Sequence, residues 1–479
     1  MPWTARSPLS KPKGYAVSTA ESKPVSAMLG QRALLAAAIG AIVAQLGMVA
    51  MAQGVGIGGW GFFAATGVAF ALALANAMAY TEMALMMPNA GSLSSYAEAA
   101  LGNFPAILLV FAGYVTPALF GIPVELILAN GLVNTVLPLH VPPHTWSVVI
   151  VVVFVGLNIL GTDIFARVQT LLSFTVLVFL LVTGVTAVSG HGAHPLPAGP
   201  GTGWAGLQQQ TAVVSVLALA FWVFCGLEFV TPLVGDARNA NRDLPRAMIG
   251  GLVIIWVAQV LFALGYLFFV PRATLLDSAT PHLAYVLAVF GPYARPAFVA
   301  LALVASASLM NTTTAGVSRM LWGMAMNGQV FPIFRYEHPR FRTPVVAIVF
   351  YGALPLLGLW WSGGDANAIL PLTVAASVAW LLAYMTAQVS LLVLRRRYPN
   401  HPRPFRVPGF PYVPILAILG MGFVVYHSAP TPEMGPQILR YTGGVLGLFA
   451  VVGAVWVKFV MRKGLFEPAT PESLLIHRD

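Results

Sequence analysis

Long apolar runs alternate with short polar connectors along the whole chain, and this pattern predicts membrane-spanning helices. An α-helix rises ~1.5 Å per residue, so about 20 apolar residues cross a hydrocarbon core of ~30 Å. We therefore expect an all-α membrane protein with 12 transmembrane helices. The runs cover residues 31–54, 62–86, 104–137, 146–161, 167–189, 211–232, 246–270, 293–316, 344–362, 368–394, 411–428 and 437–461.

The sixth run contains three residues that a continuous buried helix would not favour. Residues 220–232 include Gly226, Glu228 and Pro232. Glycine loosens the backbone, proline removes an N–H donor, and an ionisable group in hydrocarbon costs roughly 2.5 to 3.5 kcal/mol on insertion scales. A broken helix accommodates all three, and its freed N–H and C=O groups can contact a ligand where they line an enclosed cavity. We expect the functional site at this break.

The composition agrees with a lipid environment. Of 479 residues, 58% are hydrophobic and 8% are charged, whereas soluble domains carry about 25% charged residues. The net charge of +10 comes from residues in the gaps between apolar runs, which indicates membrane topology and no nucleic-acid partner. Cys225 is the single cysteine, so no intrachain disulfide can form and no redox compartment is implied.

The distribution of basic residues predicts the orientation. Residues 1–30 form a Ser/Pro/Lys-containing tail without a cleavable signal, which we interpret as a disordered cytoplasmic tail. With that end inside, the extracytoplasmic side holds only three of the 25 Lys and Arg residues: Arg272, Arg295 and Arg440. We therefore predict a multi-pass protein of the cell (inner) membrane with both termini cytoplasmic, residues 462–479 forming the C-terminal tail.

Common motifs of enzyme active sites are missing from the sequence. No Ser/His/Asp arrangement, HExxH motif or phosphate loop appears, so an enzyme is not predicted. His191 and His194 have a spacing that suits a metal, but they lie in a Gly/Pro-rich connector, residues 190–210, without Cys or carboxylate neighbours. We predict no metal site there and interpret the connector as a surface lid or a linker.

Several motifs resemble those of the amino acid-polyamine-organocation transporter superfamily. Residues 221–228, Phe-Trp-Val-Phe-Cys-Gly-Leu-Glu, with residues 235–247, Gly-Asp-Ala-Arg-Asn-Ala-Asn-Arg-Asp-Leu-Pro-Arg-Ala, resemble the sixth-helix signature of that family. Further resemblances follow in the family's order along the chain: Pro88 to Ser92 with Tyr96, Gly161 with residues 167–169, residues 318–325, Asn327-Gly328, Pro332, and Thr343-Pro344.

The resemblance implies a LeuT-like fold of 5+5 inverted repeats. Residues 31–394 would form a ten-helix transport core, with inverted repeats 31–189 and 211–394, and residues 395–461 would add helices 11 and 12. Helices 1 and 6 would be discontinuous, with a central site between them that helices 3 and 8 enclose.

Two acids lie deep in apolar runs. Glu228 is a candidate for proton coupling because desolvation favours the protonated form of a buried carboxyl group. Alternatively, it bonds freed N–H groups or a neighbouring helix without titrating. Glu125 is the second coupling candidate, and with Glu228 it could hold a cationic substrate; alternatively, it pairs with a helix of the extra bundle.

Helix 1 departs from the family pattern. Many relatives carry Gly-Ser/Thr-Gly where main-chain N–H groups receive the substrate carboxylate, but here that place holds Val43-Ala44-Gln45. Gln45 could supply side-chain donors instead, or bond another helix. The expected substrate-binding residues are Ala44, Gln45, Leu46, Tyr114, Phe221, Trp222, Phe224, Cys225 and Gly226.

The coupling ion is predicted to be H⁺ in preference to Na⁺, without a further cofactor. Some family members place in helix 5 a lysine that substitutes for a sodium ion, and residues 174–177 contain none. A sodium-like site therefore stays open at Ser306, Ser308, Asn311 or Thr312, where the alternative is helix packing.

We predict a secondary active transporter that moves a small amino acid by alternating access. An amine, polyamine or ethanolamine transporter or exchanger of the same fold is the alternative, favoured by Glu125 and the missing helix 1 glycines. A channel would need a continuous polar path, and the Gly/Pro interruptions fit a transporter better. The sequence leaves the oligomeric state open.

Overall fold

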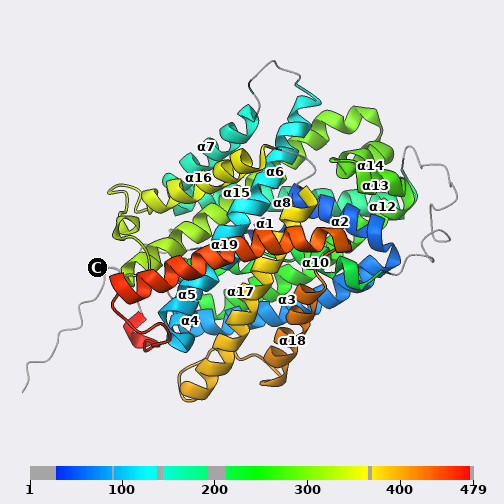
Figure 1. The fold of residues 1–479 in the computed structure, drawn as a ribbon. Coiled ribbons are helices and arrows are strands. Elements are labelled where there is room, and N and C mark those ends of the chain that lie inside the picture. The colour runs from blue at the N-terminus through cyan, green and yellow to red at the C-terminus, as the bar shows by residue number, and fades with distance from the viewer. Residues whose placement is uncertain are drawn as a thin grey trace, which may run out of the picture.

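The computed structural model describes residues 29–88, 91–137, 142, 144–192, 212–364 and 369–474. The described chain forms a bundle of tilted helices without strands (Figure 1). Most of the predicted N-terminal tail and of the 190–210 connector, including His194, lies outside these residues. The first half contains α1 (Gln31–Gly40), α2 (Gln45–Gly58), α3 (Trp60–Met86), α4 (Leu93–Leu101), α5 (Asn103–Val110), η2 (Phe111–Val115), α6 (Thr116–Asn134), α7 (Thr145–Ile159) and α8 (Thr162–Val188).

The second half begins with short pieces and continues with long helices. Its elements are η3 (Val214–Val216), α10 (Leu217–Trp222), η4 (Leu227–Asp236), α11 (Ala240–Pro245), η5 (Arg246–Gly250), α12 (Gly251–Phe269), α13 (Arg272–Asp277), α14 (Pro281–Phe290), η6 (Pro292–Ala294), α15 (Arg295–Met326), η7 (Pro332–Arg335), α16 (Val345–Ser362) and α17 (Ile369–Arg397). After them come α18 (Tyr412–Tyr426), η9 (Pro432–Met434), α19 (Gly435–Val455), η10 (Trp456–Val460) and η11 (Glu472–Leu474).

Every predicted apolar run coincides with helix in the described residues, but not every helix has membrane length. Nine helical segments there are long and apolar enough to cross a membrane, or up to ten if the bent pair α1 and α2 counts as one span. The helices α7 and α18 have 15 residues each and reach only about 22 Å at 1.5 Å per residue. Twelve crossings therefore require these two short helices to span as well.

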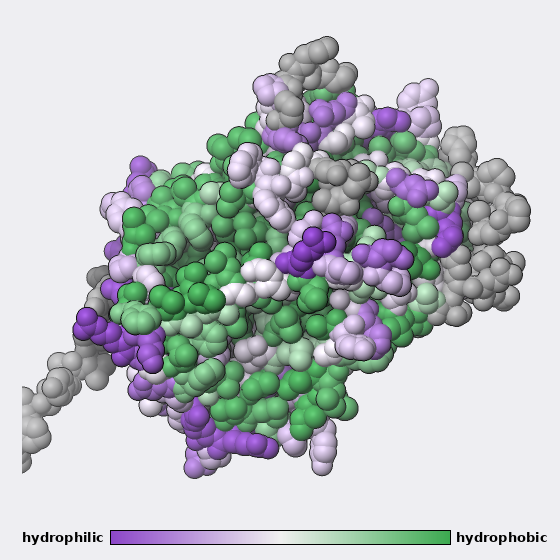
Figure 2. Space-filling model, viewed as in Figure 1, coloured by the Kyte–Doolittle hydropathy of each residue, from purple (hydrophilic) through white to green (hydrophobic). Residues whose placement is uncertain are grey.

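The surface is apolar over a broad band. In Figure 2 hydrophobic residues cover a broad area of the visible face, and polar residues gather at its lower left edge and from its centre toward the upper right. The α19 region illustrates this, since only 11% of its most apolar window is buried inside the protein. Such a surface needs lipid around it, because water would leave a large apolar area solvated.

Candidate functional site

The chain leaves regular helix and bends between α1 and α2. The first helix ends at Gly40, the second begins at Gln45, and their axes differ by 51°. Ala44, directly before α2, has an extended backbone and no side chain that could cap the helix. The first N–H groups of α2 therefore need an acceptor from elsewhere in the protein.

Glu125 of α6 supplies that acceptor. Its carboxylate accepts the N–H of Gln45 at 2.9 Å and the N–H of Leu46 at 2.7 Å. A carboxylate at the amino end of a helix is stabilised by both hydrogen bonds and the helix dipole. Glu125 thus holds the interrupted first span against α6, and its partners are not in the C-terminal helices that the sequence left as an alternative.

Three further residues complete the Glu125 network. Ser306 of α15 donates to Glu125 at 2.7 Å and lies 2.6 Å from the Gln45 side-chain amide. On its other side, the Gln45 amide oxygen lies 3.3 Å from His282 Nε2 of α14. All four side chains are fully buried. His282 was not singled out from the sequence, where a lone histidine in an apolar segment gives no signal of its partners.

Regular α-helix stops after α10 within the candidate span Val214–Asp236. This helix ends at Trp222, and Gly226 has φ +112° before η4 begins at Leu227. A side chain at Gly226 would be strained, and its Cβ would lie 2.9 Å from the Cβ of Ala41. The two interruptions therefore touch each other, with glycine allowing the close approach.

Glu228 is held by two aromatic residues of α17. It accepts hydrogen bonds from Trp380 Nε1 at 2.8 Å and from the Tyr384 hydroxyl at 2.5 Å. The same hydroxyl accepts the freed N–H of Gly226 at 3.3 Å. Trp380 and Tyr384 stand one helical turn apart on α17, a spacing that the sequence cannot distinguish from ordinary packing.

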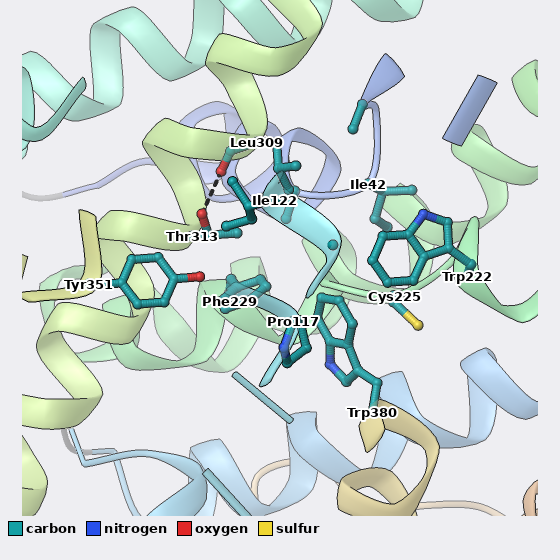
Figure 3. A pocket seen from close by; sticks show the side chains of 13 residues that line it. Ile42, Pro117, Ile122, Trp222, Cys225, Phe229, Leu309, Thr313, Tyr351 and Trp380 are labelled. Atoms are coloured by element: carbon teal, nitrogen blue, oxygen red, sulfur yellow. Dashed lines mark hydrogen bonds between the residues drawn. The ribbon is translucent and has the colours of Figure 1, made fainter. Parts of the chain in front are cut away.

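A small cavity lies between the two interruptions (Figure 3). Its free volume is about 20 Å³, room for one or two water molecules. The rings of Trp222, Tyr351 and Trp380 surround it in Figure 3. None of its lining residues is charged: Ala41, Ile42, Ala44, Pro117, Gly121, Ile122, Trp222, Cys225, Phe229, Leu309, Thr313, Tyr351 and Trp380.

Three of the nine expected substrate-binding residues line this cavity, namely Ala44, Trp222 and Cys225. Gln45 and Leu46 contact Glu125 beside it, and the N–H of Gly226 contacts Tyr384. The remaining three expected residues pack around the site or away from it.

The three remaining candidates are aromatic. Phe221 packs against Tyr384 with ring centres 5.9 Å apart, and Tyr114 packs edge-on against Phe229 at 5.2 Å. Phe224 lines a different pocket, together with Trp256. A helix that is apolar all round does not reveal which face meets the cavity, so the sequence could not separate these residues.

Three of the four residues of the suspected sodium-like site are divided between two networks, and the buried hydroxyl of the fourth, Thr312, has no hydrogen-bond partner in the described residues. Ser306 belongs to Glu125, while Ser308 accepts from the Gln169 amide of α8 at 2.8 Å and donates to Gly40 O at 3.0 Å. Asn311 donates to Gln169 at 2.8 Å. Neutral side chains thus bind one another where α1, α8 and α15 meet.

No cluster of three or more His, Cys, Asp or Glu residues that could hold a metal ion occurs in the described part of the chain. His191 is partnered by Ser189 at 2.9 Å, near the surface.

The comparisons with known proteins identify the family. A family model described as "Amino acid permease" matches residues 29–455. The chain belongs to the amino acid permease family. As a member of it, the protein is a multi-pass membrane transporter for small-molecule amino acid substrates and not an enzyme.

Curated relatives of the permease include two from Bacillus subtilis. The branched-chain amino acid permease BcaP is 27% identical over 436 residues, covering 86% of this chain and 90% of BcaP. The serine/threonine exchanger SteT is 27% identical over 377 residues, covering 76% of this chain and 82% of SteT. The low-affinity putrescine importer PlaP of Escherichia coli is 24% identical, covering 64% of this chain and 69% of PlaP.

A solved structure of a Na⁺-coupled sialic acid symporter, in a substrate-bound outward-open state, has a similar fold. The TM-score is 0.52 at 10% sequence identity, covering 84% of this chain and 89% of the symporter. This likeness supports a LeuT-like transporter fold for the permease.

Proposed function

We propose that the permease moves a small amino acid by alternating access and couples that movement to H⁺. The proposed architecture has twelve crossings in two inverted repeats, 31–189 and 211–394, followed by two C-terminal helices. The first and sixth crossings are broken at the central cavity. The protein lies in the cell inner membrane with both termini cytoplasmic, as the distribution of Lys and Arg favours.

The observation that carries H⁺ coupling is the placement of two buried carboxyl groups at the two interruptions. Glu125 bonds the amino end of α2, and Glu228 bonds Trp380 and Tyr384 beside Gly226. Their donors are neutral, so a proton can neutralise either acid without competing with a salt bridge. Because both acids sit where the broken spans meet, a change in their charge alters the contacts that hold these spans.

Reconstituted protein tests the proposal. Amino acid uptake into liposomes is measured with and without an inward proton gradient, for the wild type and for Glu228→Gln and Glu125→Gln. Glu433→Gln serves as the control, because this acid is exposed and does not line the cavity. We expect the control to accumulate substrate as the wild type does. At least one of the buried variants should keep counterflow exchange but lose gradient-driven accumulation. Gradient-driven uptake that survives in both would refute the assigned coupling.

An amine substrate is the second candidate. Its specific support is that Glu125 already occupies the N–H groups of Gln45 and Leu46, donors that suit a substrate carboxylate at a broken helix. An amine lacks the carboxylate and needs no displacement of Glu125. Competition between a neutral amino acid and its decarboxylated amine distinguishes the two candidates. At low concentration, only the compound that the site prefers should inhibit uptake of the other compound.

A further inference from the structure

Three polar side chains in the wall of the central cavity already have hydrogen-bond partners within the protein. Thr313 donates to Leu309 O at 2.9 Å, as Figure 3 shows. Cys225 Sγ lies 3.5 Å from Phe221 O, and Trp380 Nε1 is bound to Glu228. The other polar groups of the lining are the Tyr351 hydroxyl, which points into the cavity in Figure 3, and the ring N–H of Trp222. With no charged lining residue and mostly apolar side chains, this wall favours an apolar group, because an unpaired polar group would lose its hydrogen bonds to water.

Gly121 of α6 leaves room for the indole of Trp222, which forms part of this wall. A Cβ placed on Gly121 would lie 2.6 Å from Trp222 Cη2 and 3.3 Å from Cζ2. Carbon atoms pack at about 3.5 to 4.0 Å, so any side chain at residue 121 forces the indole to move. The ring of Trp222 also packs edge-on against Trp380 with centres 5.7 Å apart. The indole therefore sits directly on the α6 backbone beside α17.

Trp222 occupies a place where the wall can move. It is the last residue of α10, and the chain is not helical again until Leu227. Trp222 is half-buried, whereas its neighbours Phe221 and Val223 are buried. The cavity of about 20 Å³ holds no more than one or two water molecules. A ligand side chain larger than a methyl group requires a wall residue to shift, and the indole has the least confined position.

We propose that Gly121 is a positioning residue which, through Trp222, sets the largest substrate side chain that this cavity accepts. The proposal rests on the proposed amino acid transport and deepens it. The charged ends of the amino acid find no charged partner on this wall and lie toward the interruptions of the first and sixth spans.

Two glycines of the same helix give a matched pair of variants. Gly121→Ala places a Cβ against Trp222, whereas Gly131→Ala on α6 places one where nothing lies within 4 Å. Uptake of alanine, valine, leucine, phenylalanine, serine and lysine is measured in liposomes for both. For Gly121→Ala we expect the KM of leucine to rise ~10-fold or more, as one methylene misfit in an apolar pocket does. The KM of alanine should change less than about threefold, and Gly131→Ala should behave as the wild type.

Trp222→Leu provides a second, opposite test that does not depend on the folding of Gly121→Ala. Removal of the indole should lower the KM of phenylalanine relative to that of alanine. Equal losses for all substrates in Gly121→Ala, with unchanged ratios in Trp222→Leu, would overturn the inference and leave amino acid transport intact. A wild type that prefers serine or lysine to valine and leucine would overturn it too. Only a wild type that transports none of these amino acids would remove the proposed function with it.

Discussion

The hydroxyl of Tyr384 lies 2.5 Å from the Glu228 carboxylate and accepts the Gly226 N–H at 3.3 Å. One side chain of α17 thus bonds both the acid and the main chain of the turn between α10 and η4. We expect Tyr384→Phe to destabilise the protein by about 1.5 to 3 kcal/mol, the value of a hydrogen bond to a charged group. Thermal unfolding in detergent measures this change. Tyr412→Phe, an exposed position, should have no effect.

The same substitution should change transport. Without the Tyr384 hydroxyl, the Glu228 carboxyl group loses one of its side-chain donors, so the balance between its charged and neutral forms should change. The pH dependence of uptake should therefore differ between Tyr384→Phe and the wild type. If the pH dependence of uptake is unchanged in this variant, Tyr384 takes no part in proton coupling and has a structural role only.

Removal of the Glu125 carboxylate should destabilise the protein, because α2 loses the acceptor at its amino end. In Glu125→Ala the buried N–H groups of Gln45 and Leu46 lose their acceptor, and an unsatisfied buried donor costs about 1 to 3 kcal/mol. We expect a clear fall in thermal stability. Glu125→Gln keeps one carbonyl acceptor and should lose less. Equal stability of the two variants would argue against capping as the role of Glu125.

Glu98 of α4 should make stability depend on pH. It is buried and accepts from Gln329 Nε2 at 2.8 Å and Asn327 Nδ2 at 3.3 Å. Burial raises the pKa of Glu98 to about 7, although nearby Lys463 and Asn327 favour the charged form. Because burial raises the folded-state pKa of Glu98 above its unfolded value, the stability that this group contributes is complete below the unfolded pKa and is lost as pH rises through about 7.

Thermal unfolding between pH 5 and 8 measures the effect of Glu98. We expect the wild type to lose more stability over this range than Glu98→Gln, which carries no titrating group at this position. Parallel pH curves for the two proteins would show that burial does not raise the folded-state pKa of Glu98 above its unfolded value. The charge state of Glu98 affects stability because its hydrogen bonds to Asn327 and Gln329 join α4 to the loop after α15.

Glu82 at the end of α3 anchors two arginines. Arg395 donates to it through two nitrogens at 2.7 and 2.5 Å, and Arg403 Nε lies 3.2 Å away. The N–H of Val407 completes the set at 2.7 Å. Glu82→Ala removes the only side chain of this group that bears negative charge, and breaking a buried pair costs about 3 to 5 kcal/mol. A large loss of folded protein after detergent extraction is expected. Glu433→Ala should show none.

The positions of the helices could be predicted from sequence, because burial in lipid demands long apolar runs and these are local. The interruption near Gly226 was also local, since glycine, a carboxylate and proline change backbone preferences where they stand. The family motifs gave the correct family for the same reason. The number of crossings does not follow from these runs alone, because α7 and α18 have 15 residues each and are shorter than the hydrocarbon core.

The partners of the two acids were decided only by tertiary structure. Glu125 caps α2, and Glu228 meets Trp380 and Tyr384 of α17, 152 and 156 residues away along the chain. The same holds for Phe224, which faces away from the cavity. In helices that are apolar on every side, hydropathy fixes where a helix lies but not how it is rotated. Packing between helices sets that rotation, and the rotation selects which side chains meet.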